Sequence, residues 1–152
     1  MTAPGERDLA RLLAALDARL VGPVLVYVTV PAGRTMPAGL GPVMRMEEAE
    51  GTTLVLPRDE ALAAGLAGVF PCRMITLTVP SSLEAVGFMA AVAGRLAAAG
   101  IGVNPVAGFH HDHLFVAEAD AAAALQVLHA LAASHTLASS QIPASSHAGP
   151  PA

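Results

Sequence analysis

The chain has 152 residues, of which 54% are hydrophobic and 3% aromatic, and its twelve acidic side chains face eight basic ones that are all arginine. This length suits one compact domain or two small units that share a core, and the composition predicts a core of alanine, leucine and valine. The formal net charge of −4 and the scattered arginines argue against nucleic acid as a partner, because a phosphate backbone is bound by clustered cationic groups.

Cys72 is the only cysteine, so no disulfide within the chain is expected and nothing indicates an oxidising compartment. The N-terminal residues lack the charged-then-apolar pattern of a secretory signal. The most apolar stretch, residues 83–103, contains Glu84, Arg95 and four glycines, which argues against a membrane span of ~20 residues. We therefore expect a cytoplasmic protein with no membrane partner.

The first half of the chain reads as a helix, a strand, a hairpin and a short helix. Asp8 is a typical helix N-cap, and leucines at helical spacing follow it as far as Leu20, beyond which Gly22-Pro23 interrupt the pattern. Alternating valines predict a strand that begins at Val24, and Asp59 is expected to cap the short helix. The expected elements are a helix over 9–20, strands over 24–30, 43–48 and 52–56, and a helix over 59–66.

The second half reads as a strand, a helix, two strands and a helix. Ser81 and Glu84 have the spacing of a capping box, and the helix that they predict is apolar nearly all the way round, so we expect it to be covered on two sides. Pro105 predicts an edge strand or a bulge because it has no backbone N–H. Asp120 is expected to cap the last helix. The expected elements are strands over 74–79, 101–107 and 113–118, and helices over 83–99 and 120–133.

This order indicates an α+β fold of the ferredoxin-like kind, a split βαβ sandwich whose second half lacks one strand. The strand at 24–30 could supply the missing strand if the two halves exchange elements, which predicts that residues 70–134 do not fold alone. We expect a first unit over 1–70, a second unit over 71–133 and a disordered tail rich in Ser, Ala and Pro over 134–152.

Three sequence blocks are distinctive: they read EGTTLVLP at 50–57, ITLTVPSSLEAVGF at 75–88 and NPVAGFHHDHLFV at 104–116. In order and spacing, these blocks resemble a family of short bacterial ACT-domain proteins, which resembles the arginine-sensing ACT proteins more distantly. The resemblance covers most of residues 9–132. It implies two tandem ACT-like units that bind a small ligand, such as an amino acid, and that have no catalytic activity. The chain departs from the family pattern at Pro105 and at Phe109, where the usual tyrosine hydroxyl is lost.

The turn at Ser81-Ser82 is the candidate ligand site. A helix N-terminus leaves backbone N–H groups free and carries partial positive charge, so a helix beginning at Leu83 would hold a carboxylate. Asp112 lies at a strand-entry turn and is the candidate partner for an ammonium group. We therefore predict a ligand-binding site formed by Ser81, Ser82, Leu83 and Asp112. The alternative is that Ser81 and Glu84 only satisfy the start of the helix.

The HHDH sequence at 110–113 raises the question of a metal site, since imidazole and carboxylate groups bind zinc and similar ions. Strand alternation would place His111 and His113 on one face, so further ligands such as His129 or Glu118 would be needed. A hydrogen-bonded turn is the alternative, and we expect neither a metal nor a cofactor.

Three functions remain open on the sequence. The first is a regulatory module that binds an amino acid and is not an enzyme; the chain has no Gly-x-Ser-x-Gly nucleophile motif and no dinucleotide fingerprint. The second is a protein-interaction module that forms a homo-oligomer and binds no ligand. The third is a metal-dependent enzyme that uses residues 110–113.

Overall fold

A computed structural model describes residues 4–140 and contains one six-stranded antiparallel sheet with the strand order β2-β3-β1-β4-β6-β5. The α+β, ferredoxin-like fold expected from the sequence is confirmed. The elements are α1 (Leu9–Ala14), β1 (Ala18–Pro31), β2 (Met44–Glu48), β3 (Gly51–Pro57), α2 (Arg58–Ala63), β4 (Val69–Leu77), α3 (Phe88–Ala98), β5 (Val103–Ala107), β6 (Asp112–Ala117), a 3₁₀ turn (Glu118–Asp120) and α4 (Ala121–Ser140).

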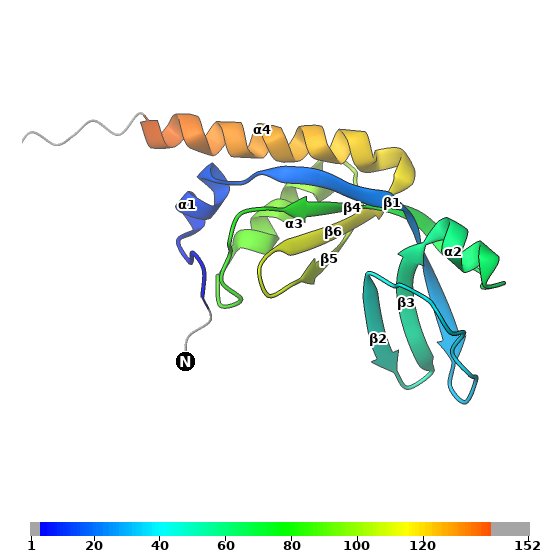
Figure 1. Cartoon of the computed structure of the whole chain (residues 1–152). Helices are drawn as coiled ribbons and strands as arrows, with labels where there is room; N and C mark the ends of the chain where they lie inside the picture. Colours follow the sequence, from blue (N-terminus) through cyan, green and yellow to red (C-terminus); the bar gives the residue numbers. More distant parts are fainter. Residues whose placement is uncertain (1–3, 141–152) are drawn as a thin grey trace, which may run out of the picture.

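The helices form two groups on the sheet. Figure 1 shows α1, α3 and α4 beside the part of the sheet made by the first half of β1 and by β4, β6 and β5, whereas α2 packs beside β1 and β3. Residues of β1 enter three cores. Ala18 lies in the core of the first group, Val26 and Val28 lie in the core under α2, and Leu25 lies in a third core with Cys72 and Phe115. The larger core is lined by leucines and valines with one large aromatic side chain, Phe88, which is 2% exposed.

Strand β1 belongs to both halves of the sheet. Its first part, Ala18 to Val21, pairs with β4. Its second part, Leu25 to Pro31, pairs with β3 on one side, and Leu25 and Tyr27 also pair with β4 on the other. The expected strand over 24–30 does reach β4, at Leu25 and Tyr27, but the segment that pairs with the last residues of β4 is residues 18–21, of which the sequence assigned 18–20 to a helix. That assignment was wrong, because backbone pairing with β4 outweighs the helical preference of these residues.

Gly22-Pro23 interrupt β1 without ending it. Gly22 has a φ of +73°, and the register of β1 against β4 shifts between Val21 and Leu25. Pro23 cannot donate to a strand ladder, so an irregularity is the position at which a sheet tolerates it. Arg73 donates from Nη2 to the Gly22 carbonyl at 3.0 Å and so occupies the carbonyl that the irregularity exposes.

Other boundaries differ from expectation as well: β4 begins at Val69 and ends at Leu77, where a strand over 74–79 was expected. Helix α3 begins at Phe88 after the N-cap Gly87, so residues 81–87 form a loop and the predicted capping box of Ser81 and Glu84 is wrong. Helix α2 begins directly after Pro57 with no side-chain cap.

The end of the chain also differs. Helix α4 continues to Ser140, so the tail expected from residue 134 begins with helix. Residues 141–152 of the expected tail lie outside the described residues, and the division at residue 70 stays a prediction. Within residues 4–140, no helix combines the length and the apolar character that crossing a lipid bilayer requires.

Candidate functional site

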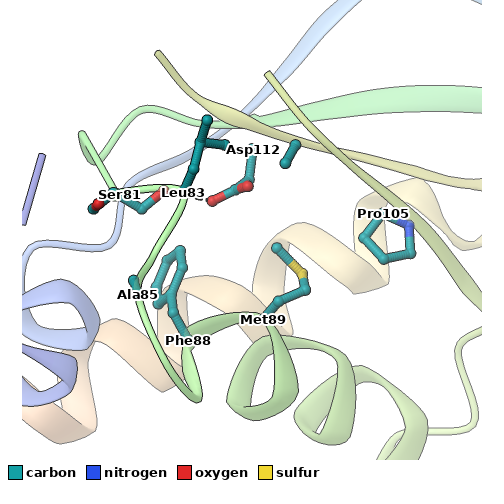
Figure 2. Close-up of a pocket in the computed structure, with 9 residues that line it drawn as sticks. Ser81, Leu83, Ala85, Phe88, Met89, Pro105 and Asp112 are labelled. Atoms are coloured by element: carbon teal, nitrogen blue, oxygen red, sulfur yellow. Dashed lines mark hydrogen bonds between the residues drawn. The ribbon is translucent and has the colours of Figure 1, made fainter. Parts of the chain in front are cut away.

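A cavity of about 270 Å³ lies where the loop before α3, the first turn of α3 and the ends of β5 and β6 meet. Figure 2 shows Phe88 and Met89 rising from α3 on one side, with Asp112 opposite them and Pro105 at the far end. This volume lies just below the ~300–1,000 Å³ of typical small-molecule sites, so it suits a small metabolite. The lining residues are Ser81, Ser82, Leu83, Ala85, Phe88, Met89, Pro105, Ala107 and Asp112.

Asp112 is the one ionisable side chain among the described residues that line the cavity, and it is only 9% exposed. It is the first residue of β6, where its backbone lies between Leu77 of β4 and Ala107 of β5. The Ser81 hydroxyl donates to Asp112 Oδ2 at 2.6 Å, and Figure 2 shows the two side chains next to each other. A carboxylate accepts several hydrogen bonds, so this serine leaves acceptor capacity for a ligand that donates.

All four residues that the sequence nominated line this one cavity. Ser82 is buried, and its hydroxyl accepts from the Glu84 backbone N–H at 3.2 Å. Its carbonyl accepts from the Ala85 N–H at 2.9 Å, so these contacts shape the loop. Leu83 is 56% exposed and stands at the rim.

The source of free backbone N–H groups differs from expectation. The sequence placed them at Ser81, but the Ser81 N–H donates to Val79 and the Ser82 N–H donates to Glu6. The first turn of α3 has no side-chain cap, and its residues Phe88 and Met89 line the cavity. A helix start leaves backbone N–H groups without partners in the helix and carries a positive dipole end, so a first turn beside the cavity makes the local field more favourable for an anion.

Sequence reasoning missed the residues that close the cavity from α3 and β5. Phe88, Met89, Pro105 and Ala107 were not nominated. The only signal for the first two was Gly87, because a glycine with a φ of +88° is typical of a break between a loop and a helix. For Pro105 and Ala107 the signal was the strand pairing of β5 with β6, which puts Ala107 opposite Asp112.

The histidine segment next to the cavity does not form one group. His110 and His111 precede β6, so the strand alternation expected for them does not apply. His113 lies in β6 opposite Thr76, and its Nδ1 is 3.0 Å from Thr76 Oγ1. Burial lowers the pKa of His113, and the nearby His111 adds to the effect while Asp112 opposes it. Among residues 4–140, no three or more His, Cys, Asp or Glu side chains are gathered as metal ligands would be.

The ACT-domain family matches the chain twice, over residues 4–73 and over residues 69–130. The two matches overlap at the start of β4, the strand in which the first match ends and the second begins. The search of curated proteins found no match.

Solved structures give the same fold. A protein of unknown function from Vibrio cholerae, described as a possible transport protein, is 41% identical with a TM-score of 0.74, and the alignment covers 82% of this chain and 95% of that one. A protein from Agrobacterium tumefaciens is 20% identical with a TM-score of 0.65, covering 77% and 89%. The ligand-free regulatory subunit of aspartate kinase from Thermus thermophilus is 12% identical with a TM-score of 0.58, covering 76% and 97%. On the two family matches and the 41% identity, this chain belongs to the ACT-domain family and carries two ACT domains in tandem.

Proposed function

We propose that this chain is a cytoplasmic regulatory module that binds a free amino acid in the Asp112 cavity and catalyses no reaction. Membership of the ACT-domain family supports a ligand-binding regulatory module. The observation that supports an amino acid as the ligand is the hydrogen-bonded pair of Asp112 and Ser81 inside a cavity of metabolite size. The pair supplies a buried carboxylate with a neighbouring hydroxyl, and both groups recognise a donor.

The lining suits the two charges of an amino acid. Among the described residues 4–140, no arginine or histidine lines the cavity, so Asp112 sets its charge and favours a positive group such as an ammonium. A bound carboxylate would find donors at the uncapped start of α3, near Phe88 and Met89. Glu84 is paired with Arg7 at 2.9 Å on the outside of the loop, and this ion pair reduces its repulsion of an anion.

A thermal-shift screen of the full chain against the twenty amino acids and the common purines tests the proposal. A compound that binds only the folded state at about 100 times its Kd adds about 2.7 kcal/mol to the free energy of unfolding. At least one amino acid should raise the Tm in a concentration-dependent way. A flat response to all twenty amino acids, or a response to purines alone, would overturn the amino-acid proposal.

Two variants distinguish a specific loss of ligand binding from a general effect of removing an acidic side chain. Asp112→Asn should abolish the shift given by the responding amino acid, because the buried negative charge is lost while the side-chain shape is kept. Asp120→Asn removes an acid from the 3₁₀ turn before α4, outside the cavity, and should leave the shift unchanged. Equal ligand response in Asp112→Asn and in the native chain would remove Asp112 from the site.

A homo-oligomer without a ligand is the second candidate, and the outer surface of α3 favours it. Ala90, Gly94 and Ala97 are exposed at helical spacing, so α3 buries one side and turns a side of small residues outward. Small residues allow close approach of a second helix. Light scattering checks this candidate: a monomer at all concentrations, combined with a Tm shift by an amino acid, leaves the regulatory module as the function.

A further inference from the structure

The segment before α1 runs along the outside of the cavity loop. The Glu6 N–H donates to the Pro80 carbonyl at 2.8 Å, and the Ser82 N–H donates to the Glu6 carbonyl at 2.9 Å. These bonds form a parallel bridge between Glu6 and Ser81. We refer to residues 5–7 as the strap. The strap therefore holds the backbone on both sides of Ser81, the residue whose hydroxyl reaches Asp112.

The strap is itself fixed to the start of α1. Glu6 Oε1 accepts from the backbone N–H groups of Arg7 at 2.8 Å and Asp8 at 2.9 Å, and these bonds lower the pKa of Glu6. Arg7 pairs with Glu84 at 2.9 Å, which ties the strap to the far side of the same loop. Helix α1 buries Leu12 in the larger core, so the strap has a rigid support.

Gly5 permits this close approach. Its φ is +114°, and a Cβ built on it would lie 2.7 Å from the Ser82 nitrogen and 2.8 Å from the Pro80 oxygen. Both atoms belong to the backbone and cannot move aside as a flexible side chain can. Any residue larger than glycine would therefore push the strap away from the loop.

We propose that Gly5 and Glu6 are positioning residues for the cavity: the strap fixes the position of the Ser81 backbone, so that the Ser81 hydroxyl donates to Asp112. Only the reading of the cavity as a ligand site rests on the proposed function. The coupling between strap and hydroxyl is a property of the chain without any ligand. A displaced strap leaves the loop free to turn Ser81 away from Asp112, and the cavity loses the donor that orients its carboxylate.

A double-mutant cycle on the full chain measures this coupling by urea unfolding. A hydrogen bond to a charged group contributes about 1.5–3 kcal/mol, so Ser81→Ala alone should raise the unfolding constant at least about tenfold. In the Gly5→Ala background, the same substitution should change the constant by less than about threefold, because the bond is already lost. The control background is Gly39→Ala: Gly39 also has a positive φ, +80°, but a Cβ there meets no atom within 4 Å. Ser81→Ala should keep its full effect in that background.

A reciprocal measurement applies even if Gly5→Ala does not fold. Ser81→Ala should raise the hydrogen-exchange rates of the Glu6 and Ser82 amides at least about fivefold more than that of the Ala91 amide, which donates to Gly87 at the start of α3. Equal effects of Ser81→Ala in the Gly5→Ala and Gly39→Ala backgrounds would overturn the proposal, as would unchanged exchange at both amides. Neither measurement uses a ligand, so a chain that binds no amino acid can still confirm the strap.

Discussion

Leu20 of β1 lies opposite Ile75 of β4, so a residue near the start of the chain completes the sheet that supports the second ACT domain. Ile75 is fully buried, and Leu20 packs against the same core. The two domains therefore share strands and are not joined by a linker. The cavity at Asp112 depends on this arrangement, because β4 lies between β1 and the strand that carries the acid.

A fragment of residues 70–134 should fail to fold. It lacks the part of β1 that pairs with β4 and also lacks α1, whose buried leucines Leu12 and Leu13 close the larger core. Far-UV circular dichroism and urea unfolding should show no cooperative transition, whereas a chain of residues 4–140 should unfold cooperatively. A stable fragment would show that the second domain does not need the borrowed strand.

Acidification should destabilise the fold through His113. The pKa of His113 lies below its ordinary value of 6.5 in the folded chain because burial disfavours the charged ring. The unfolded chain therefore binds the proton first, so stability that is present above pH ~6.5 is lost as the pH falls through that value toward the lower folded pKa. Urea unfolding at pH 7.5 and pH 5.5 should show this loss, and His113→Asn should reduce it. His110→Asn alters an exposed turn residue and should keep the native pH dependence.

The single thiol should be unreactive in the folded chain. Cys72 is fully buried, and burial raises its pKa to about 11, so about one thiol in a thousand would be ionised at pH 8. A disulfide reagent should react at least about 100-fold more slowly with the native chain than with the chain in guanidinium. Leu25 of β1 and Ala117 of β6 flank Cys72 in the sheet. Rapid labelling of the native chain would mean that β4 separates readily from these neighbouring strands.

Leu83→Ser should weaken ligand binding without weakening the fold. Leu83 is 56% exposed at the cavity rim, so the free energy of unfolding should change by no more than about 0.5 kcal/mol. Removal of apolar contact should lower the affinity for the responding amino acid about threefold or more, as calorimetry would measure. Val86→Ser is the matched control, since Val86 is 84% exposed in the same loop and does not line the cavity. Equal affinities in the two variants would remove Leu83 from the site.

Local signals in the sequence predicted much of the fold. The Asp8 side chain accepts from the Arg11 N–H at 2.9 Å, as its N-cap position indicated. Strands β2 and β3 form the hairpin that the sequence predicted, and Pro105 lies in the edge strand β5, as its missing N–H indicated. Each of these features depends on residues close together in the chain, where propensity and turn chemistry decide the conformation.

The errors fall where distant segments decide the structure. The leucine spacing predicted that the first helix extends to Leu20, but residues 18–21 form a strand because they pair with β4. The capping-box pattern at Ser81 was overruled by two segments far away in the sequence: Glu6 pairs with the backbone of Pro80 and Ser82 on either side of Ser81, and Asp112 accepts from the Ser81 hydroxyl. Ser81 and Asp112 line one cavity because β4 pairs with β6, as expected from the sequence for these strands, whereas the helix expected to start beside Ser81 begins at Phe88.

The two outermost strands of the sheet are poor templates for a strand from another molecule. Strand β2 carries Arg45, Glu47 and Glu48, and strand β5 has Pro105 at its centre, where no N–H is offered. Charges and proline at sheet edges are common protections against edge-to-edge aggregation. Edge-to-edge strand pairing between copies of this chain is therefore disfavoured, and crowding should not turn the sheet into a seed for fibrils.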